Sequence, residues 1–81
     1  MNIYKHNGRS NISGIQVKEA RLKAELTQEQ LAAQVQVAGL DITQRAISRI
    51  ETGNRVVPDY ELKYLAQALD VSILYLLGEE K

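Results

Sequence analysis

The absence of cysteine from a chain of only 81 residues limits what this sequence can fold into. A chain of about 80 residues buries only roughly 60 to 65% of the surface that its unfolded form exposes, so its core is small. Without cysteine, no disulfide or thiolate zinc site can support that core, and no cysteine nucleophile is present. A small fold of this kind is most easily built from helices. The sequence therefore predicts one small helical domain in an intracellular protein.

The composition and the N-terminal sequence argue against a membrane or secreted protein. Hydrophobic residues make up 44% of the chain and charged residues 25%, both near the globular average. The N-terminal stretch MNIYKHNGRSNIS lacks the apolar run of a signal peptide, and no window approaches ~18 uninterrupted apolar residues. We therefore expect a cytoplasmic protein without a membrane partner.

Basic and acidic residues are equal in number, 10 of each, but they are unevenly distributed. Residues 1–55 contain eight basic and five acidic side chains, whereas residues 56–81 contain two basic and five acidic ones. A binding surface responds to the local field and not to the total charge, so a neutral chain can still bind a polyanion. Ordinary scatter of the charges is the alternative explanation, and the asymmetry by itself is only a pointer.

Apolar spacing and helix-end signals predict an all-α fold. Apolar residues recur at three- and four-residue steps, and no segment alternates long enough to be a strand. In the first helix this spacing turns Val17, Ala20 and Ala24 toward the core. Helices are expected over about 13–24, 27–38, 43–52, from Pro58 or Asp59 through Leu69, and 73–77. Residues 1–12 are expected to form a flexible arm with at most a short ordered end, residues 13–78 the domain, and residues 79–81 a tail.

Capping side chains mark the starts of the two central helices. Thr27 and Gln30 have the spacing of a capping box, in which each side chain bonds the backbone N–H of the other residue. Asp41 and Thr43 are both possible caps for the third helix. Gly53 is well placed to adopt the left-handed conformation just past the end of that helix.

Catalytic and metal-binding chemistry finds no support in the sequence. The single histidine, His6, lies in the expected arm, where a Ser-His-Asp arrangement would have no rigid scaffold. The five glycines are too far apart to form a phosphate-cradling loop, and no carboxylates cluster with metal-ligand spacing. We therefore expect no enzyme, no catalytic residue, no metal, no cofactor and no small-molecule effector.

The pair of capped helices over 27–38 and 43–52 could carry a function. Such a pair can lay its second helix in the major groove of DNA, which is about 12 Å wide. At about 100° per residue, the second helix gathers four polar side chains in one sector: Gln44, Arg45, Ser48 and Arg49. An arginine fork matches guanine O6 and N7, and a glutamine amide matches adenine N6 and N7. From composition alone, the solvated face of an amphipathic helix is the more ordinary explanation.

Residues 17–77 resemble the Cro/repressor (XRE-type) helix-turn-helix family of bacterial and phage transcription regulators. The resemblance rests on Arg21 six residues before Thr27, on the segments LTQEQLA and TQRAISRIETG, and on the ending ALDVSILYLLG. Each part is weak evidence alone, but their order along the chain is specific. The resemblance implies a compact five-helix bundle of the lambda-repressor-like type, with a recognition helix at about 43–52 in the major groove of double-stranded DNA.

The same resemblance implies roles for individual residues. It implies base-reading contacts, with Ser48 the lesser one, from Gln44, Arg45, Ser48 and Arg49. It implies DNA phosphate contacts from Gln28, Thr43, Asn54 and Arg55. A helix N-terminus such as that at Gln28 also offers free N–H groups to an anion. Arg21 and Glu51 correspond to a semi-buried ion pair that ties the first helix to the recognition helix.

The chain departs from the family pattern at three places. The link QVQVAGLDI is longer than usual, so we expect a longer second helix and a wider turn, and phosphate contacts near 36–42 are left unassigned. Glu25 stands where the family commonly has glycine, which predicts a strained or differently shaped corner. Leu74 replaces a polar residue, so that 73–77 is apolar on every side. The core either wraps this last helix fully or leaves its outer face as an interface, and an interface is favoured.

Together these features predict a small DNA-binding transcription regulator, most simply a repressor, that is nucleoid-associated when bound. One such module buries only ~600 to 1,000 Å² on DNA, so a homodimer on a two-fold operator is expected. Leu74 and Tyr75 are the candidate dimer contacts. The alternative is a protein-interaction module, such as an antitoxin or an anti-repressor partner, that keeps the fold without reading DNA.

Overall fold

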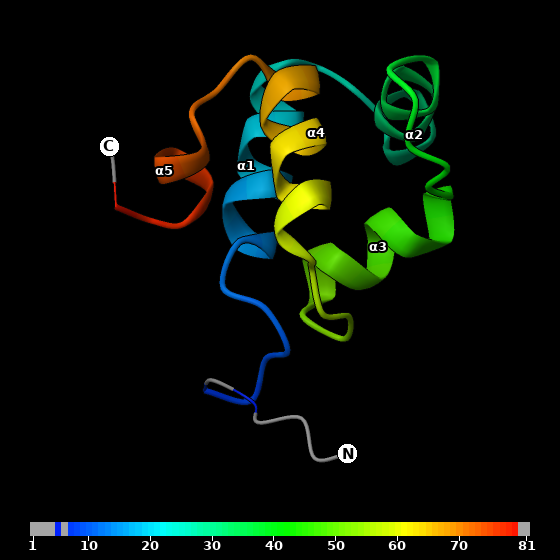
Figure 1. The fold of residues 1–81 in the computed structure, drawn as a ribbon. Coiled ribbons are helices and arrows are strands. Elements are labelled where there is room, and N and C mark those ends of the chain that lie inside the picture. The colour runs from blue at the N-terminus through cyan, green and yellow to red at the C-terminus, as the bar shows by residue number, and fades with distance from the viewer. Residues whose placement is uncertain (1–4, 6, 80–81) are drawn as a thin grey trace.

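The computed structural model describes residue 5 and residues 7–79, and these residues form five helices and no strand. The helices are α1 (Gly14–Lys23), α2 (Gln28–Val37), α3 (Gln44–Thr52), α4 (Asp59–Leu69) and α5 (Ile73–Leu76) (Figure 1). The predicted all-α fold is therefore confirmed, with helix ends within one residue of those expected. His6 and most of the expected tail lie outside the described residues.

Two helices form the centre of the bundle and the other three pack against them. Helices α1 and α4 lie side by side, α2 and α3 lie on one side of them, and α5 lies on the other (Figure 1). Their apolar faces meet in one core, whose fully buried side chains are Val17, Leu31, Val35, Ile47, Ile50, Leu65 and Leu76. The core therefore takes side chains from all five helices, as the apolar spacing predicts. No helix in the described part of the chain is long and apolar enough to cross a membrane.

The corner between α1 and α2 contains a residue in the left-handed backbone conformation. It lies where the sequence predicts a strained or differently shaped corner. Glu25 has φ of 60°, and the N–H of Leu26 donates to the carbonyl of Arg21 at 3.0 Å to close the end of α1. A side chain in this conformation costs about 1 to 2 kcal/mol, because its Cβ crowds the backbone, and only glycine avoids that cost. The corner is therefore strained at Glu25. Ala24, which was expected in the core, is exposed, because α1 ends at Lys23 and the chain turns there.

The long link between α2 and α3 forms an ordered turn. Gly39 takes φ of 116°, and the N–H of Leu40 donates to the carbonyl of Val35 at 3.2 Å, which closes α2. Ile42, only 2% exposed, then returns the chain to the core. Thr43 is the cap of α3, since its hydroxyl accepts from the N–H of Ala46 at 3.1 Å. The extra residues therefore widen the turn and still deliver α3 onto the core.

Candidate nucleic-acid interface

The first residues of α2 and α3, Gln28 and Gln44, are bonded to each other, so the two helices begin close together. Gln44 Nε2 donates to Gln28 Oε1 at 2.7 Å. Each helix start is also capped. The Thr27 hydroxyl accepts from the N–H of Gln30 at 3.0 Å while the Thr27 N–H donates to Gln30 Oε1 at 2.8 Å, which confirms the capping box. Thr43 uses its hydroxyl oxygen as the cap of α3 and keeps its O–H proton to donate elsewhere.

One face of α3 is open to solvent and carries the side chains predicted to read bases. Gln44, Arg45 and Arg49 are exposed and Ser48 is half-buried. The opposite face is anchored by Ile47 and Ile50, both fully buried. Within the described part of the chain, neither Arg45 nor Arg49 forms an ion pair or a hydrogen bond through its guanidinium. Two cations one turn apart are therefore held at a fixed helix surface, and neither has a partner among the residues that the structure describes.

Gln28 connects this face to the interior. Its Nε2 donates to Glu51 Oε1 at 3.1 Å, while its Oε1 accepts from Gln44. The bond leaves Gln44 with its Oε1 and one N–H, which are the two groups that a bidentate contact with adenine uses. The residue predicted to bind phosphate thus orients the residue predicted to read a base.

Arg21 and Glu51 form a buried ion pair that ties α1 to α3. Arg21 Nε lies 2.7 Å from Glu51 Oε2, Arg21 Nη2 donates to Glu51 Oε1 at 3.0 Å, and Arg21 Nη1 donates to the carbonyl of Leu26 at 2.8 Å. The two side chains are 10% and 3% exposed. The hydrogen bond to Glu51 raises the pKa of Arg21, although burial acts in the opposite direction. This pair fixes the position of α3 against the first helix.

The loop after α3 places Asn54 and Arg55 differently. Asn54 is exposed, and its main-chain N–H donates to the carbonyl of Arg49 at 2.8 Å. Arg55 pairs with Glu61 of α4 through both Nη1 and Nη2, the second at 3.0 Å. The hydrogen bond to Glu61 raises the pKa of Arg55, with burial opposing it. Arg55, predicted as a phosphate ligand, therefore already has a carboxylate partner, Glu61, that no pattern in the sequence predicts.

Two further residues at this end of α3 are not predicted by the sequence. Arg9 and Asn11 belong to the segment expected as an arm, yet both donate hydrogen bonds to main-chain carbonyls at the end of α3. The segment packs against Gly14 and Gly53. These two glycines are the one sequence signal that could have indicated a close approach of the backbone here.

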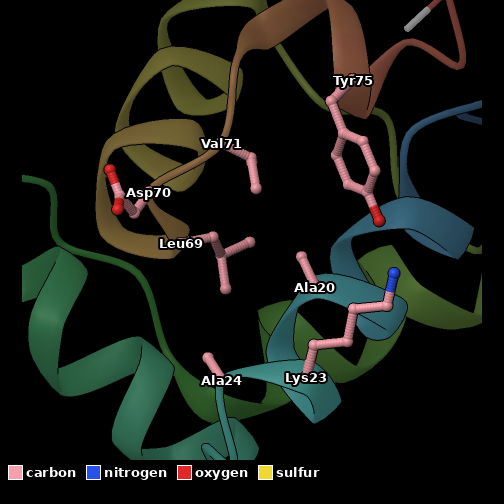
Figure 2. A pocket seen from close by; sticks show the side chains of 7 residues that line it. All are labelled: Ala20, Lys23, Ala24, Leu69, Asp70, Val71 and Tyr75. Carbon is pink, nitrogen blue, oxygen red and sulfur yellow. The ribbon is translucent and has the colours of Figure 1, made fainter. Parts of the chain in front are cut away.

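A groove of about 410 Å³ lies between α1 and the α4–α5 connection, on the side that carries α5. Its lining residues are Ala20, Lys23, Ala24, Leu69, Asp70, Val71 and Tyr75 (Figure 2). The side chains of Leu69 and Val71 form one apolar wall, and the Tyr75 ring extends toward Lys23 on the other (Figure 2). Tyr75, a candidate dimer contact, therefore lines this groove. Among the residues that the structure describes, no three His, Cys, Asp or Glu side chains could hold a metal ion.

The capped pair α2 and α3, with an open polar face on the second helix, is the geometry of a helix-turn-helix module. The helix-turn-helix family model matches residues 17–76, well over half of the chain. No curated relative matches the sequence. The chain belongs to the Cro/repressor-type (XRE) helix-turn-helix family of DNA-binding transcription regulators, as predicted.

Proposed function

We propose that the protein binds double-stranded DNA sequence-specifically, with α3 in the major groove. The observation that carries the proposal is the face of α3, where Arg45 and Arg49 are exposed one turn apart beside Gln44 and have no partner among the described residues. An arginine that has no internal partner can offer its whole fork to guanine O6 and N7. Because Ile47 and Ile50 anchor the opposite face, these side chains would meet the bases from a rigid helix.

The remaining site residues are proposed to set the register on the duplex. Ser48 would make a lesser base contact, while phosphate contacts would come from Gln28, Thr43, Asn54 and Arg55. Gln28 and Thr43 lie at helix starts, where the positive end of the helix dipole and free backbone N–H groups favour an anion. Such contacts position the protein and carry no sequence information themselves.

A homodimer that acts as a repressor is the simplest form of this proposal. Leu74 is 55% exposed and Tyr75 borders the apolar groove, so both are available to a second copy. Because α5 lies on the side of α1 and α4 away from α3, a contact there leaves the reading face free (Figure 1). Occupying an operator is enough for repression, and the protein would act in the cytoplasm on the nucleoid.

Salt dependence of DNA binding tests the function. Fluorescence anisotropy with mixed-sequence duplexes should show the logarithm of the association constant falling linearly with the logarithm of salt concentration, by about 0.9 for each phosphate neutralised. A slope near zero would sink the proposal and favour the protein-interaction module instead.

Selection from random DNA tests the base-reading residues. Arg45→Ala and Arg49→Ala should each relax the preference at one base pair by ~1 to 3 kcal/mol. Lys63→Ala removes the same charge from an exposed position on α4 and should leave the preference intact. If the two arginine variants keep the full preference of the wild type, the assignment is wrong.

Sedimentation tests the dimer. Leu74→Glu should shift the protein toward the monomer and weaken operator binding, because a charge in an apolar contact is costly to desolvate. Val37→Glu, at a position 90% exposed near the end of α2, is the matched control. Unchanged association of the Leu74 variant would exclude α5 as the contact.

A further inference from the structure

We infer that residues 9–11, called here the N-terminal clasp, position loop 53–55 for contact with DNA phosphates. The inference rests on the proposed function, because this loop carries Asn54 and Arg55. The clasp lies shortly before α1 in the sequence, yet its hydrogen bonds run to the end of α3, about 40 residues further along the chain.

The first part of the clasp supplies donors to the end of α3. The last carbonyls of a helix lack donors within the helix. Arg9 Nη2 donates to the carbonyls of Glu51 at 3.0 Å and Ile50 at 3.4 Å, and Arg9 Nε donates to the carbonyl of Asn11 at 3.2 Å. The guanidinium also brings a positive charge to the negative end of the helix dipole. Arg9 thus fixes the last turn of the proposed recognition helix.

The second part of the clasp holds the loop itself. The N–H of Ser10 donates to the carbonyl of Gly53 at 2.8 Å. Asn11 Nδ2 donates to the carbonyls of Ile50 at 3.0 Å and Arg55 at 2.8 Å. The Asn11 Oδ1 accepts from the N–H of Gly14 at 2.8 Å. One asparagine amide therefore joins the start of α1, the end of α3 and the main chain of the loop.

Two glycines make room for the clasp. A Cβ at Gly14 would lie 2.0 Å from the carbonyl oxygen of Ile50 and 2.6 Å from Arg9 Nη2. A Cβ at Gly53, where φ is 83°, would lie 2.8 Å from Arg9 Cζ. The segment, α1 and α3 therefore approach one another more closely than any side chain at these positions would allow. A fit this close holds the loop in a defined place.

The clasp holds the main chain of the loop and bonds neither of its two polar side chains. The clasp bonds the carbonyls of Gly53 and Arg55, while Glu61 holds the Arg55 side chain from α4. Asn54 is exposed between these two anchors, where its Nδ2 donates to Thr52 Oγ1 at 3.2 Å. A loop that is ordered before binding loses less conformational entropy when it meets a phosphate. Arg9 and Asn11 are therefore positioning residues for the phosphate contacts.

Two variants test the clasp without changing the charge of the protein. Asn11→Ala removes the amide, and Arg9→Lys keeps the charge but loses the planar fork. Ser10→Ala is the control, because Ser10 contributes its main-chain N–H, which the substitution retains. Ala66→Gly, at a buried position of α4 away from the clasp, is a second control, because it lowers the stability of the fold without changing the clasp.

Two measurements decide the outcome. Hydrogen exchange at the Gly53 and Asn54 amides, which bond the carbonyls of Ile50 and Arg49, should be faster in both clasp variants. Under conditions where they are fully folded, both variants should bind every DNA sequence several-fold more weakly and with unchanged base preference. Their salt slope should be smaller by up to about 0.9, because Arg55 is the one charged side chain of loop 53–55 and can neutralise one phosphate. The Ser10 and Ala66 variants should keep the wild-type slope.

Wild-type exchange and wild-type slope in the clasp variants would overturn the inference while leaving DNA binding intact. A smaller slope in Ala66→Gly as well would also overturn it, because stability alone would then explain the effect. If Asn11→Ala does not fold, Arg9→Lys decides by the same criteria. A wild-type protein without salt-dependent binding would instead remove the proposed function itself, and the role of the clasp in DNA binding with it.

Discussion

Gln44 Nε2 lies 2.7 Å from Gln28 Oε1, so the first residue of α3 is hydrogen-bonded to the first residue of α2. Gln28 also donates to Glu51, and Glu51 pairs with the buried Arg21. The exposed amide of Gln44 is thereby connected to α1 through a chain of side-chain bonds. Its orientation is set before any ligand arrives, which reduces the entropy lost on binding.

This chain of bonds predicts that Gln28 and Gln44 act together on DNA. In a cycle of Gln28→Ala, Gln44→Ala and the double variant, the losses in DNA affinity should differ from additivity by about 0.5 to 1.5 kcal/mol. Anisotropy titrations at one salt concentration measure the four affinities. A cycle between Gln28 and Arg49, for which no bond is present, is the control. Additive losses for Gln28 and Gln44 would show that their bond does not matter in the complex.

The buried ion pair predicts a large loss of stability on removing one partner. Glu51→Ala leaves Arg21 buried with only the carbonyl of Leu26 as acceptor, and should lower the free energy of unfolding by about 3 to 5 kcal/mol. Urea denaturation followed by circular dichroism measures the change. Glu19→Ala removes a glutamate from the exposed pair with Lys23 and should leave the midpoint unchanged. Equal effects of the two substitutions would contradict the structural role of Glu51.

The strained corner predicts a stabilising substitution. Glu25→Gly should raise the free energy of unfolding by about 0.5 to 1 kcal/mol, because glycine adopts φ of 60° without crowding its Cβ. Glu25→Ala keeps a Cβ in the same conformation and should give little or no gain. Both changes can be read from the urea midpoint. A loss of stability in the glycine variant would mean that the Glu25 side chain contributes more than its strain costs.

The pairing of Arg55 with Glu61 predicts that this acid restrains DNA binding. Glu61→Gln should tighten binding to all sequences, because a neutral amide competes with a phosphate for Arg55 less strongly than a carboxylate does, while the clasp still holds the main chain. Asp59→Asn removes the same charge two residues earlier on α4 and should have a smaller effect. If the two variants behave alike, Arg55 serves the fold and not the DNA.

Local chemistry explains which parts of this structure the sequence predicts. The capping box of Thr27 and Gln30 and the cap at Thr43 involve residues three apart, so their pattern can be read directly. The positions of Arg45 and Arg49 follow from helical periodicity alone. Family resemblance added the pairing of Arg21 with Glu51, which no local pattern contains.

Contacts between distant segments explain what the sequence did not predict. Arg9 and Asn11 lie in a polar stretch without periodicity. Their partners are main-chain carbonyls, which every residue type has, so the sequence does not reveal them. In the sequence, Glu61 is an ordinary acidic residue in the first turn of a helix. In the structure, the turn at Pro58 places it next to Arg55. Only the packed fold brings such groups together.

The placement of α5 away from α3 also decides how the protein can be handled in experiments. A reporter or surface anchor joined after Glu79 would leave the chain beside α5, on the side of α1 and α4 away from α3 (Figure 1). A purification tag joined ahead of Lys5 would instead add bulk a few residues before Arg9, in the segment that bonds the end of α3 and loop 53–55. DNA affinities measured on N-terminally tagged protein should therefore be compared with those of the tag-free form before any contact is assigned.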